Sequence, residues 1–204
     1  MNRRILLTGG AGYIGSHTAV VLAGAGATVT VCDNFANSHP RVLDRLERLL
    51  GHPVPCAGID IRDTDALTGL LQRERIDAVV HFAGLKAVGE SVVRPVEYFD
   101  NNVGGTLSLL TAMTRAGVST LVFSSSATVY GQPEYLPMDE AHPTRATNPY
   151  GRSKLHIEEI LRDTAESDPR WRIACLRYFN PVGAHESGLL GEDPNGIPNN
   201  LMPY

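Results

Sequence analysis

Residues 8–15, TGGAGYIG, determine the fold that we expect for this chain. They follow a short apolar run at residues 4–8 and precede a helical stretch at residues 16–25. Glycines at this turn permit a tight bend, close approach of the backbone to a pyrophosphate, and close packing of helix on strand. The N-terminus of the helix then presents N–H groups to the phosphates. The order of strand, glycines and helix predicts a dinucleotide-binding unit.

An acidic residue ends the next predicted strand, at residues 28–32. Asp33 comes 18 residues after Gly15. A carboxylate at this point accepts hydrogen bonds from the adenosine ribose hydroxyls and repels a 2′-phosphate, so it favours NAD over NADP. The plain alternative is a solvated aspartate in a loop.

Strands and helices alternate through residue 180. We expect strands at 4–8, 28–32, 54–59, 76–83, 118–123 and 171–179, and helices at 16–25, 41–50, 64–75, 96–116 and after Pro149. This alternation predicts an α/β fold, a doubly wound parallel sheet of the Rossmann type with strand order 3-2-1-4-5-6 and helices on both faces. Residues 1–180 would form an NAD-binding domain. Residues 181–204, rich in glycine and proline, would begin a substrate-binding region.

Composition narrows the class of protein. The 204 residues are 43% hydrophobic and 20% charged, with a net charge of −4, as in globular proteins with a sizeable core. Without a basic block, composition gives no sign of a nucleic-acid partner. Cys32, Cys56 and Cys175 lie far apart, which favours a reducing compartment and argues against a metal site. The apolar run near Met1 is too short for a signal peptide, and no later stretch would span a bilayer. We therefore expect a cytoplasmic protein with no membrane partner.

A tyrosine and a lysine lie four residues apart in a predicted helix. Tyr150 and Lys154 would share one face of the helix that begins near Pro149. A free tyrosine has a pKa of about 10, so a base working near pH 7 needs about 4 kcal/mol of extra phenolate stabilisation. A fixed ammonium supplies part of that, and a cationic cofactor could supply the rest. Only Lys86 and Lys154 are lysines among 18 basic residues, which suggests that Lys154 must be a lysine. The plain alternative is a surface helix that carries the pair by chance.

Four further motifs carry a family resemblance. They are residues 81–91 (HFAGLKAVGES), 124–131 (SSSATVYG), 177–184 (RYFNPVGA) and 196–204 (GIPNNLMPY). Together with residues 8–17, 33–34 and 150–154, they make the chain resemble the extended short-chain dehydrogenase/reductase family, and within it the branch of UDP-sugar 4-epimerases. The resemblance runs the length of the chain.

The resemblance implies a reaction and three catalytic residues. Tyr150 would take the proton of the sugar 4-hydroxyl while NAD accepts the C4 hydride. Lys154 would hold the nicotinamide ribose and lower the Tyr150 pKa, and Ser126 would hydrogen-bond the reacting hydroxyl. The 4-keto sugar would then turn over and take the hydride back on its other face. The implied activity is interconversion of UDP-galactose and UDP-glucose, as in galactose metabolism.

The resemblance also implies binding residues and an assembly. Positions that match cofactor contacts are Gly9, Gly12, Tyr13, Ile14, Gly15, Asp33, Asn34, Asn37, Ser38, Asp60, Ile61, Phe82, Ala83, Gly84, Lys86, Asn101, Ser124, Tyr150, Lys154, Tyr178 and Phe179. Positions that match contacts to the UDP-sugar are Ser126, Tyr150, Asn180, Asn200 and Leu201. No metal is implied. In this family the helix near residues 96–116 and the Tyr150 helix pair across a homodimer.

The chain departs from the family pattern at three places. Ile59 replaces a usual glycine before Asp60, so the backbone there is expected to approach the adenine differently. Gly104 replaces a usual asparagine. The family continues past the match to Tyr204 into a substrate domain whose arginines grip the diphosphate. We therefore expect a fragment or an incomplete product that is not a competent epimerase by itself.

Other functions stay open from the sequence. One is another NAD-dependent nucleotide-sugar epimerase or decarboxylase, and another is a catalytically idle NAD-binding module. Retention of Ser126, Tyr150 and Lys154 together argues against the idle module. A 4,6-dehydratase is disfavoured because its relatives place an Asp-Glu pair where this chain has Ala127 and Thr128, neither of which is a general acid or base.

Overall fold

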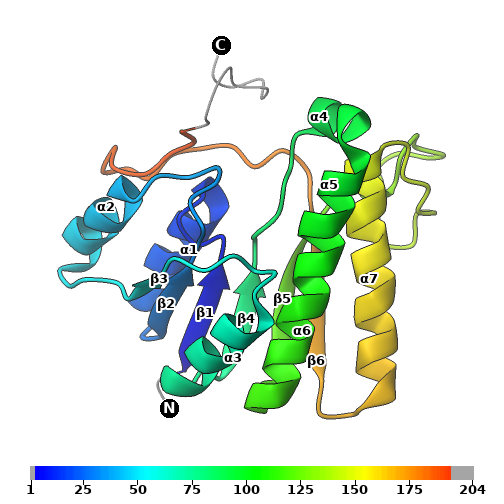
Figure 1. Ribbon diagram of the computed structural model, residues 1–204. Coiled ribbons are helices and arrows are strands. Elements are labelled where there is room, and N and C mark those ends of the chain that lie inside the picture. The colour runs from blue at the N-terminus through cyan, green and yellow to red at the C-terminus, as the bar shows by residue number, and fades with distance from the viewer. Residues whose placement is uncertain (1–2, 194–204) are drawn as a thin grey trace.

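A computed structural model describes residues 3–193. One sheet of six parallel strands has the order β3-β2-β1-β4-β5-β6, which confirms the predicted Rossmann topology (Figure 1). The strands are β1 (Arg4–Thr8), β2 (Thr28–Cys32), β3 (Cys56–Ala57), β4 (Ala78–His81), β5 (Thr120–Ser126) and β6 (Arg172–Tyr178). The helices are α1 (Tyr13–Gly24), α2 (Arg41–Leu50), α3 (Thr64–Arg73), α4 (Val88–Val93), α5 (Pro95–Phe99), α6 (Gly105–Ala116) and α7 (Pro149–Ser167), with a π-helix at Asp100–Gly104 and a 3-10 turn at Ala127–Val129.

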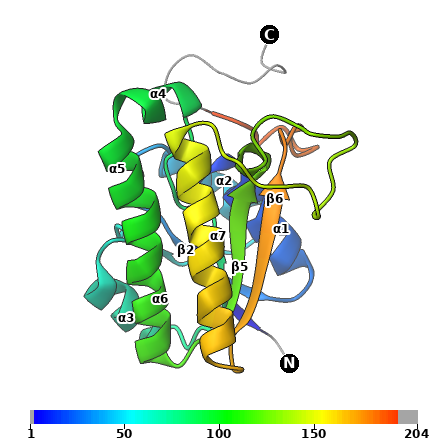
Figure 2. The ribbon, with the colours of Figure 1, turned by 90° about the vertical axis from the view of Figure 1, so that its right-hand side faces the viewer.

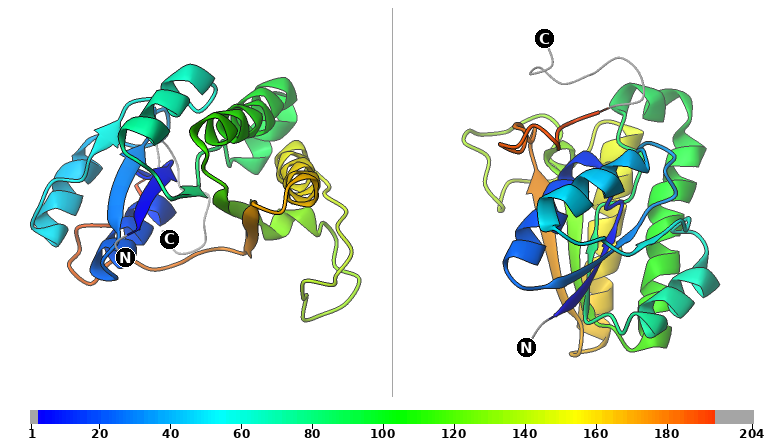
Figure 3. Two further views of the ribbon diagram at one scale, coloured as in Figure 1. Left: turned by 90° about the horizontal axis from the view of Figure 1, so that it is seen from below. Right: turned by 90° about the vertical axis from the view of Figure 1, so that its left-hand side faces the viewer.

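Helices cover the sheet in two separate layers (Figure 3). In β1, Leu6 faces a core that α3, α6 and α7 close, whereas Ile5 and Leu7 face a second core that α1 and α2 close. Alternate residues of a strand point to opposite faces, so β1 is apolar throughout. Both cores therefore depend on the same central strand.

The carboxyl ends of the strands meet at one edge of the sheet, the upper edge in Figure 1. In the strand register Thr8 lies opposite both Cys32 and His81, and Ser126 lies opposite Tyr178. Ligands of doubly wound sheets bind outside this edge, near the point where the strand order reverses. In this chain the reversal lies between β1 and β4.

Several predicted elements have the wrong bounds. The strand expected at 54–59 pairs only over Cys56–Ala57, and the strand expected at 76–83 pairs over Ala78–His81. The helix expected at 96–116 is not one α-helix, because a π-helical turn at Asp100–Gly104 interrupts it. Helix α4 was not predicted.

Gly105 shows why glycine occurs inside this long helix. A Cβ at Gly105 would lie 2.4 Å from Cδ1 of Ile61, so a side chain there would collide with it. Ile59 packs against the core of α3, α6 and α7. The isoleucine that departs from the family pattern thus has a packing role. A Cβ at Gly104 would meet only Asp100 Oδ1, at 3.7 Å.

The described part of the final segment crosses the carboxyl edge from β6 toward α2 (Figure 1). Leu190 is buried against the core of α1 and α2, and Lys86 Nζ lies 3.0 Å from a Glu192 oxygen. The Tyr13 hydroxyl donates to the Gly183 carbonyl. The segment is irregular, as predicted, but it is anchored at three points along residues 183–192.

Candidate active site

The glycine turn forms a cradle that side chains would fill. A Cβ at Gly9 would lie 2.6 Å from the Ala83 nitrogen, and a Cβ at Gly15 would lie 2.4 Å from the Gly9 oxygen. A Cβ at Gly12 would meet only the Gly9 oxygen, at 3.2 Å. No side chain caps α1, and no acidic residue lies in its first turn, where Tyr13 and Ile14 stand. The N-terminus of α1 is therefore suited to an anion such as a pyrophosphate.

Asp33 lies at the carboxyl end of β2, directly beside this turn. Its carboxylate accepts hydrogen bonds from the backbone N–H of Ala11 at 3.0 Å and of Phe35 at 2.9 Å. The Ser38 hydroxyl donates to the same carboxylate at 2.9 Å. The predicted cofactor residues Asp33 and Ser38 are thus brought together and oriented, while Asn37 is exposed in the loop.

Asp60 and Asn34 form a second polar group at this end of the sheet. Asn34 Nδ2 donates to Asp60 at 3.2 Å, and Arg62 forms an ion pair with Asp60 at 2.8 Å. Hydrogen bonds from Arg62 hold the pKa of Asp60 near 2. Arg62 also contacts Asp100 at 2.6 Å and so ties this loop to the π-helix. The predicted contact Ile61 is buried beneath Gly105.

The loop after β4 brings Phe82, Ala83 and Gly84 against the glycine turn and Lys154. A Cβ at Gly84 would lie 3.1 Å from Asn102 Oδ1 and 3.7 Å from Lys154 Nζ. Asn102 Nδ2 donates to the Leu85 carbonyl at 3.0 Å and to the Ser153 hydroxyl at 3.1 Å. Asn102, which sequence reasoning missed, therefore joins this loop to α7. The predicted contact Asn101 donates to Asn102, and Lys86 is paired with Glu192.

Lys154 reaches from α7 to the carboxyl end of β5. Its Nζ donates to the Ser124 carbonyl at 2.9 Å, and only 5% of the residue is exposed. It lies 4.8 Å from the centroid of the Phe123 ring and 5.9 Å from that of Tyr150. Burial lowers the pKa of Lys154 to about 8, so the ammonium form still prevails at pH 7.

Tyr150 lies in the first turn of α7, which Asn148 caps by accepting the Gly151 N–H at 2.8 Å. Burial raises the pKa of Tyr150 above its ordinary value, and a hydrogen bond with the Ser126 side chain opposes that rise. The Ser126 hydroxyl accepts from the Thr128 hydroxyl at 2.9 Å. The structure thus brings together Ser126, Tyr150 and Lys154, but the protein atoms alone do not lower the Tyr150 pKa.

The other predicted site residues lie at the end of β6 or beyond. Tyr178 is half-buried, and this burial raises its pKa. Phe179, at 59% exposure, and Asn180 are exposed. Asn200 and Leu201 lie outside the described residues. Their predicted contacts to a UDP-sugar stay predictions.

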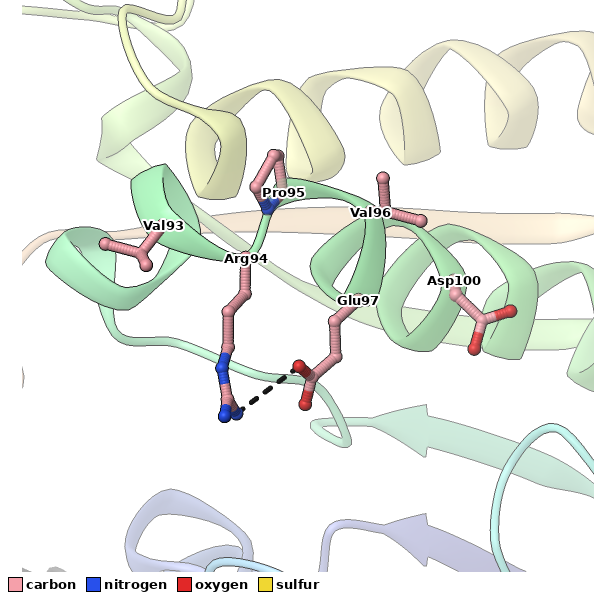
Figure 4. Close-up of a pocket in the computed structure, with 6 residues that line it drawn as sticks. All are labelled: Val93, Arg94, Pro95, Val96, Glu97 and Asp100. Atoms are coloured by element: carbon pink, nitrogen blue, oxygen red, sulfur yellow. Dashed lines mark ion pairs between the residues drawn. The ribbon is translucent and has the colours of Figure 1, made fainter.

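A surface hollow lies on α4, α5 and the start of the π-helix (Figure 4). Its lining residues are Val93, Arg94, Pro95, Val96, Glu97 and Asp100. Arg94 and Glu97 form an ion pair across it at 3.4 Å. This exposed hollow shares no residue with the carboxyl-edge site.

The described residues hold neither a cluster of metal ligands nor a membrane-spanning helix. Among residues 3–193, no three His, Cys, Asp or Glu side chains gather so that they could hold a metal ion. None of the helices that the structure describes is long and apolar enough to cross a lipid bilayer.

Comparison with known proteins assigns the chain to a family. Residues 5–204 match the profile of the NAD dependent epimerase/dehydratase family. The chain belongs to this family. It is similar to the UDP-glucose 4-epimerase of Homo sapiens, with 56% identity over 211 residues, covering 100% of this chain and 61% of the relative. It is also similar to the UDP-glucose 4-epimerase of Neisseria meningitidis serogroup C, with 55% identity, covering 99% of this chain and 60% of the relative.

Solved structures from the family agree with the fold. The UDP-glucose 4-epimerase of Stenotrophomonas maltophila, with bound NAD and formylated UDP-arabinopyranose, superposes with a TM-score of 0.97 at 51% identity, covering 100% of this chain and 60% of that one. The enzyme of Bifidobacterium longum, in complex with NAD+ and UDP, gives 0.95 at 55% identity, covering 98% and 60%. The chain thus spans about 60% of the length of these relatives.

Proposed function

We propose that the protein interconverts UDP-galactose and UDP-glucose and keeps NAD bound as a recycled cofactor. The observation that carries the proposal is the convergence of Ser126, Tyr150 and Lys154 beside a glycine turn, in a chain 56% identical to a UDP-glucose 4-epimerase. The reaction is the oxidation of C4, turning of the 4-keto sugar, and reduction on the other face.

The residues present suit NAD. The glycine turn and the uncapped N-terminus of α1 fit the pyrophosphate, and Asp33 fits an adenosine ribose without a 2′-phosphate. Bound NAD would supply the acceptor for the C4 hydride, which would be held and given back within one turnover. Asn34, Ser38 and Asp60 would contact the adenosine half.

Tyr150 and Ser126 would carry the proton chemistry. The Tyr150 phenolate accepts the proton of the sugar 4-hydroxyl as the C4 hydride leaves, and Tyr150 returns that proton when the hydride comes back. The Ser126 hydroxyl holds the reacting oxygen beside Tyr150. Since burial raises the Tyr150 pKa, the base depends on positive charge nearby. The Lys154 ammonium supplies one such charge, and the nicotinamide ring supplies the other when bound.

The substrate and the assembly are parts of the same proposal. Asn180, with Asn200 and Leu201, would contact the UDP-sugar. The protein would be a cytoplasmic homodimer with no nucleic-acid or membrane partner. Val93 and Val96, at 80% and 79% exposure, leave an apolar surface on α4 and α5 that supports pairing between copies. Residues 1–204 would be inefficient by themselves, which stays a prediction.

The experiment is turnover of UDP-galactose by the full-length protein in D₂O. NMR of the product should show UDP-glucose with protium at C4, because the hydride leaves and returns without exchange with solvent. Another nucleotide-sugar enzyme of the family would leave UDP-galactose unchanged and act on a related sugar. An idle module would release NAD on denaturation and give no product. Deuterium at C4 would contradict the proposed chemistry.

A further inference from the structure

Three consecutive serines end β5, and the proposed reaction uses only two of them. Lys154 contacts the backbone carbonyl of Ser124, and Tyr150 contacts the Ser126 side chain. Ser125 between them is 3% exposed, and its hydroxyl donates to a Glu158 oxygen at 2.5 Å. Successive side chains of a strand alternate between faces, so Ser125 is the serine whose side chain points into the α7 layer.

Glu158 continues the stripe of α7 that carries the catalytic pair. Tyr150, Lys154 and Glu158 are spaced by four residues, so they lie on one face over two further turns. Each of the three contacts β5 within residues 124–126. Figure 2 shows α7 lying along β5 and β6, with its N-terminal end at the carboxyl ends of these strands.

The Glu158 carboxylate also holds β6. Arg177 donates to it from Nη2 at 2.7 Å and from Nε at 3.1 Å, and Glu158 is 4% exposed. A carboxylate and a guanidinium joined through two nitrogens have a fixed relative orientation. Arg177 precedes Tyr178, and its guanidinium lies 4.9 Å from the centroid of the Tyr130 ring. Glu158 therefore joins the helix of the catalytic pair to β5 through Ser125 and to β6 through Arg177.

We propose that Glu158, through Ser125 and Arg177, is a positioning residue that sets the register of α7 against β5 and so places Lys154 and Tyr150. A buried ion pair by itself is weak evidence for stability, because desolvation offsets its attraction. A role in register explains why the Glu158 carboxylate also binds the Ser125 hydroxyl. Ser125 lies between Ser124, which Lys154 contacts, and Ser126, which Tyr150 contacts. The inference rests on the proposed function for its catalytic consequence, but not for its geometry.

The test is Ser125→Ala in the full-length protein, which keeps the Glu158–Arg177 pair intact. Crystal structures should show that Lys154 Nζ has moved away from the Ser124 carbonyl. In UDP-galactose turnover kcat should fall by roughly 10- to 100-fold with KM within about twofold, since small displacements of reacting groups are costly. The fall should largely disappear in a Lys154→Met background, because coupled residues are non-additive. Glu158→Gln should likewise lower kcat and move Lys154 Nζ away from the Ser124 carbonyl.

Ser91→Ala is the matched control. Ser91 is equally buried, and its hydroxyl donates to Val88 within α4, at 2.6 Å. This variant should keep kcat and the Lys154 contact unchanged. An unchanged Lys154 contact in Ser125→Ala would overturn the inference whatever the activity. An unchanged kcat, or a loss additive with Lys154→Met, would overturn it while leaving the proposed function intact. Absence of turnover in the unsubstituted protein would refute the proposed function alone, and the crystal structures would still decide the inference.

Discussion

Replacing Lys154 with methionine should convert the site into one that works only at high pH. The ammonium lies 5.9 Å from the centroid of the Tyr150 ring. At an effective dielectric constant of about 20, two unit charges about 6 Å apart attract by about 3 kcal/mol, and burial of Tyr150 opposes this attraction. This corresponds to about two pKa units of the roughly three that a tyrosine base needs near pH 7. The variant should therefore lose about 10²-fold in kcat at pH 7 and regain most of it by pH 9.

The assay is the pH profile of kcat for UDP-galactose turnover by the full-length protein, with bound NAD measured in each variant. Lys154→Arg is the companion variant. It keeps the charge, but Lys154 is buried beside the Phe123 ring at 4.8 Å, a site that suits a compact ammonium better than the larger guanidinium. It should also be slow at pH 7. A Lys154→Met deficit that is equal at pH 7 and pH 9, with NAD retained, would refute the electrostatic role.

Three further outcomes follow from named contacts. Lys154→Met should raise the Tm at pH 7, because burial lowers the Lys154 pKa to about 8, which means that keeping the ammonium charged in the folded protein costs about 3 kcal/mol of stability. The gain in Tm should shrink as pH rises from 8 to the ordinary lysine pKa. Calorimetry across this pH range measures it, and a gain that grew with pH would contradict the prediction. Denaturing the purified full-length protein should release NAD, because Asp33 disfavours a 2′-phosphate; stoichiometric NADP in the supernatant would contradict this. Val93→Glu with Val96→Glu should shift the protein toward monomer in sedimentation velocity, because both side chains are about 80% exposed; an unchanged sedimentation coefficient would argue for another interface.

Local pattern predicted most of the fold. The helix expected at residues 41–50 has the observed bounds of α2, where amphipathic spacing and a left-handed Gly51 define the end. The strand expected at 54–59 was too long, because an apolar run does not show how many residues find a paired neighbour. The π-helix at Asp100–Gly104 could not be predicted from periodicity. Its side chains contact loops distant in sequence, such as Asn102 with Leu85, which periodicity does not reveal.

Some residues of the candidate site could also be recognised from the sequence, and others could not. The glycine turn, Asp33, Tyr150 and Lys154 are recognisable because their spacing along the chain is part of the chemistry. Asn102 and Glu158 were missed because their partners lie 17 or more residues away in sequence, at Leu85, Ser125 and Arg177. The sequence also implied a lowered Tyr150 pKa, whereas burial raises it in the protein alone. The Lys154 ammonium was predicted from its spacing to Tyr150, but the burial that opposes it becomes apparent only in the folded structure.

The most direct test of the proposed reaction is the rate of the Tyr150→Phe variant of the full-length protein with UDP-galactose. The substitution removes one hydroxyl and leaves the packing of α7 intact. Loss of a general acid–base group lowers kcat by about 10²-fold or more while KM stays nearly unchanged. We expect that result, with NAD still bound and the unsubstituted protein forming UDP-glucose. A Tyr150→Phe variant that turns over UDP-galactose at the unsubstituted rate would contradict the account.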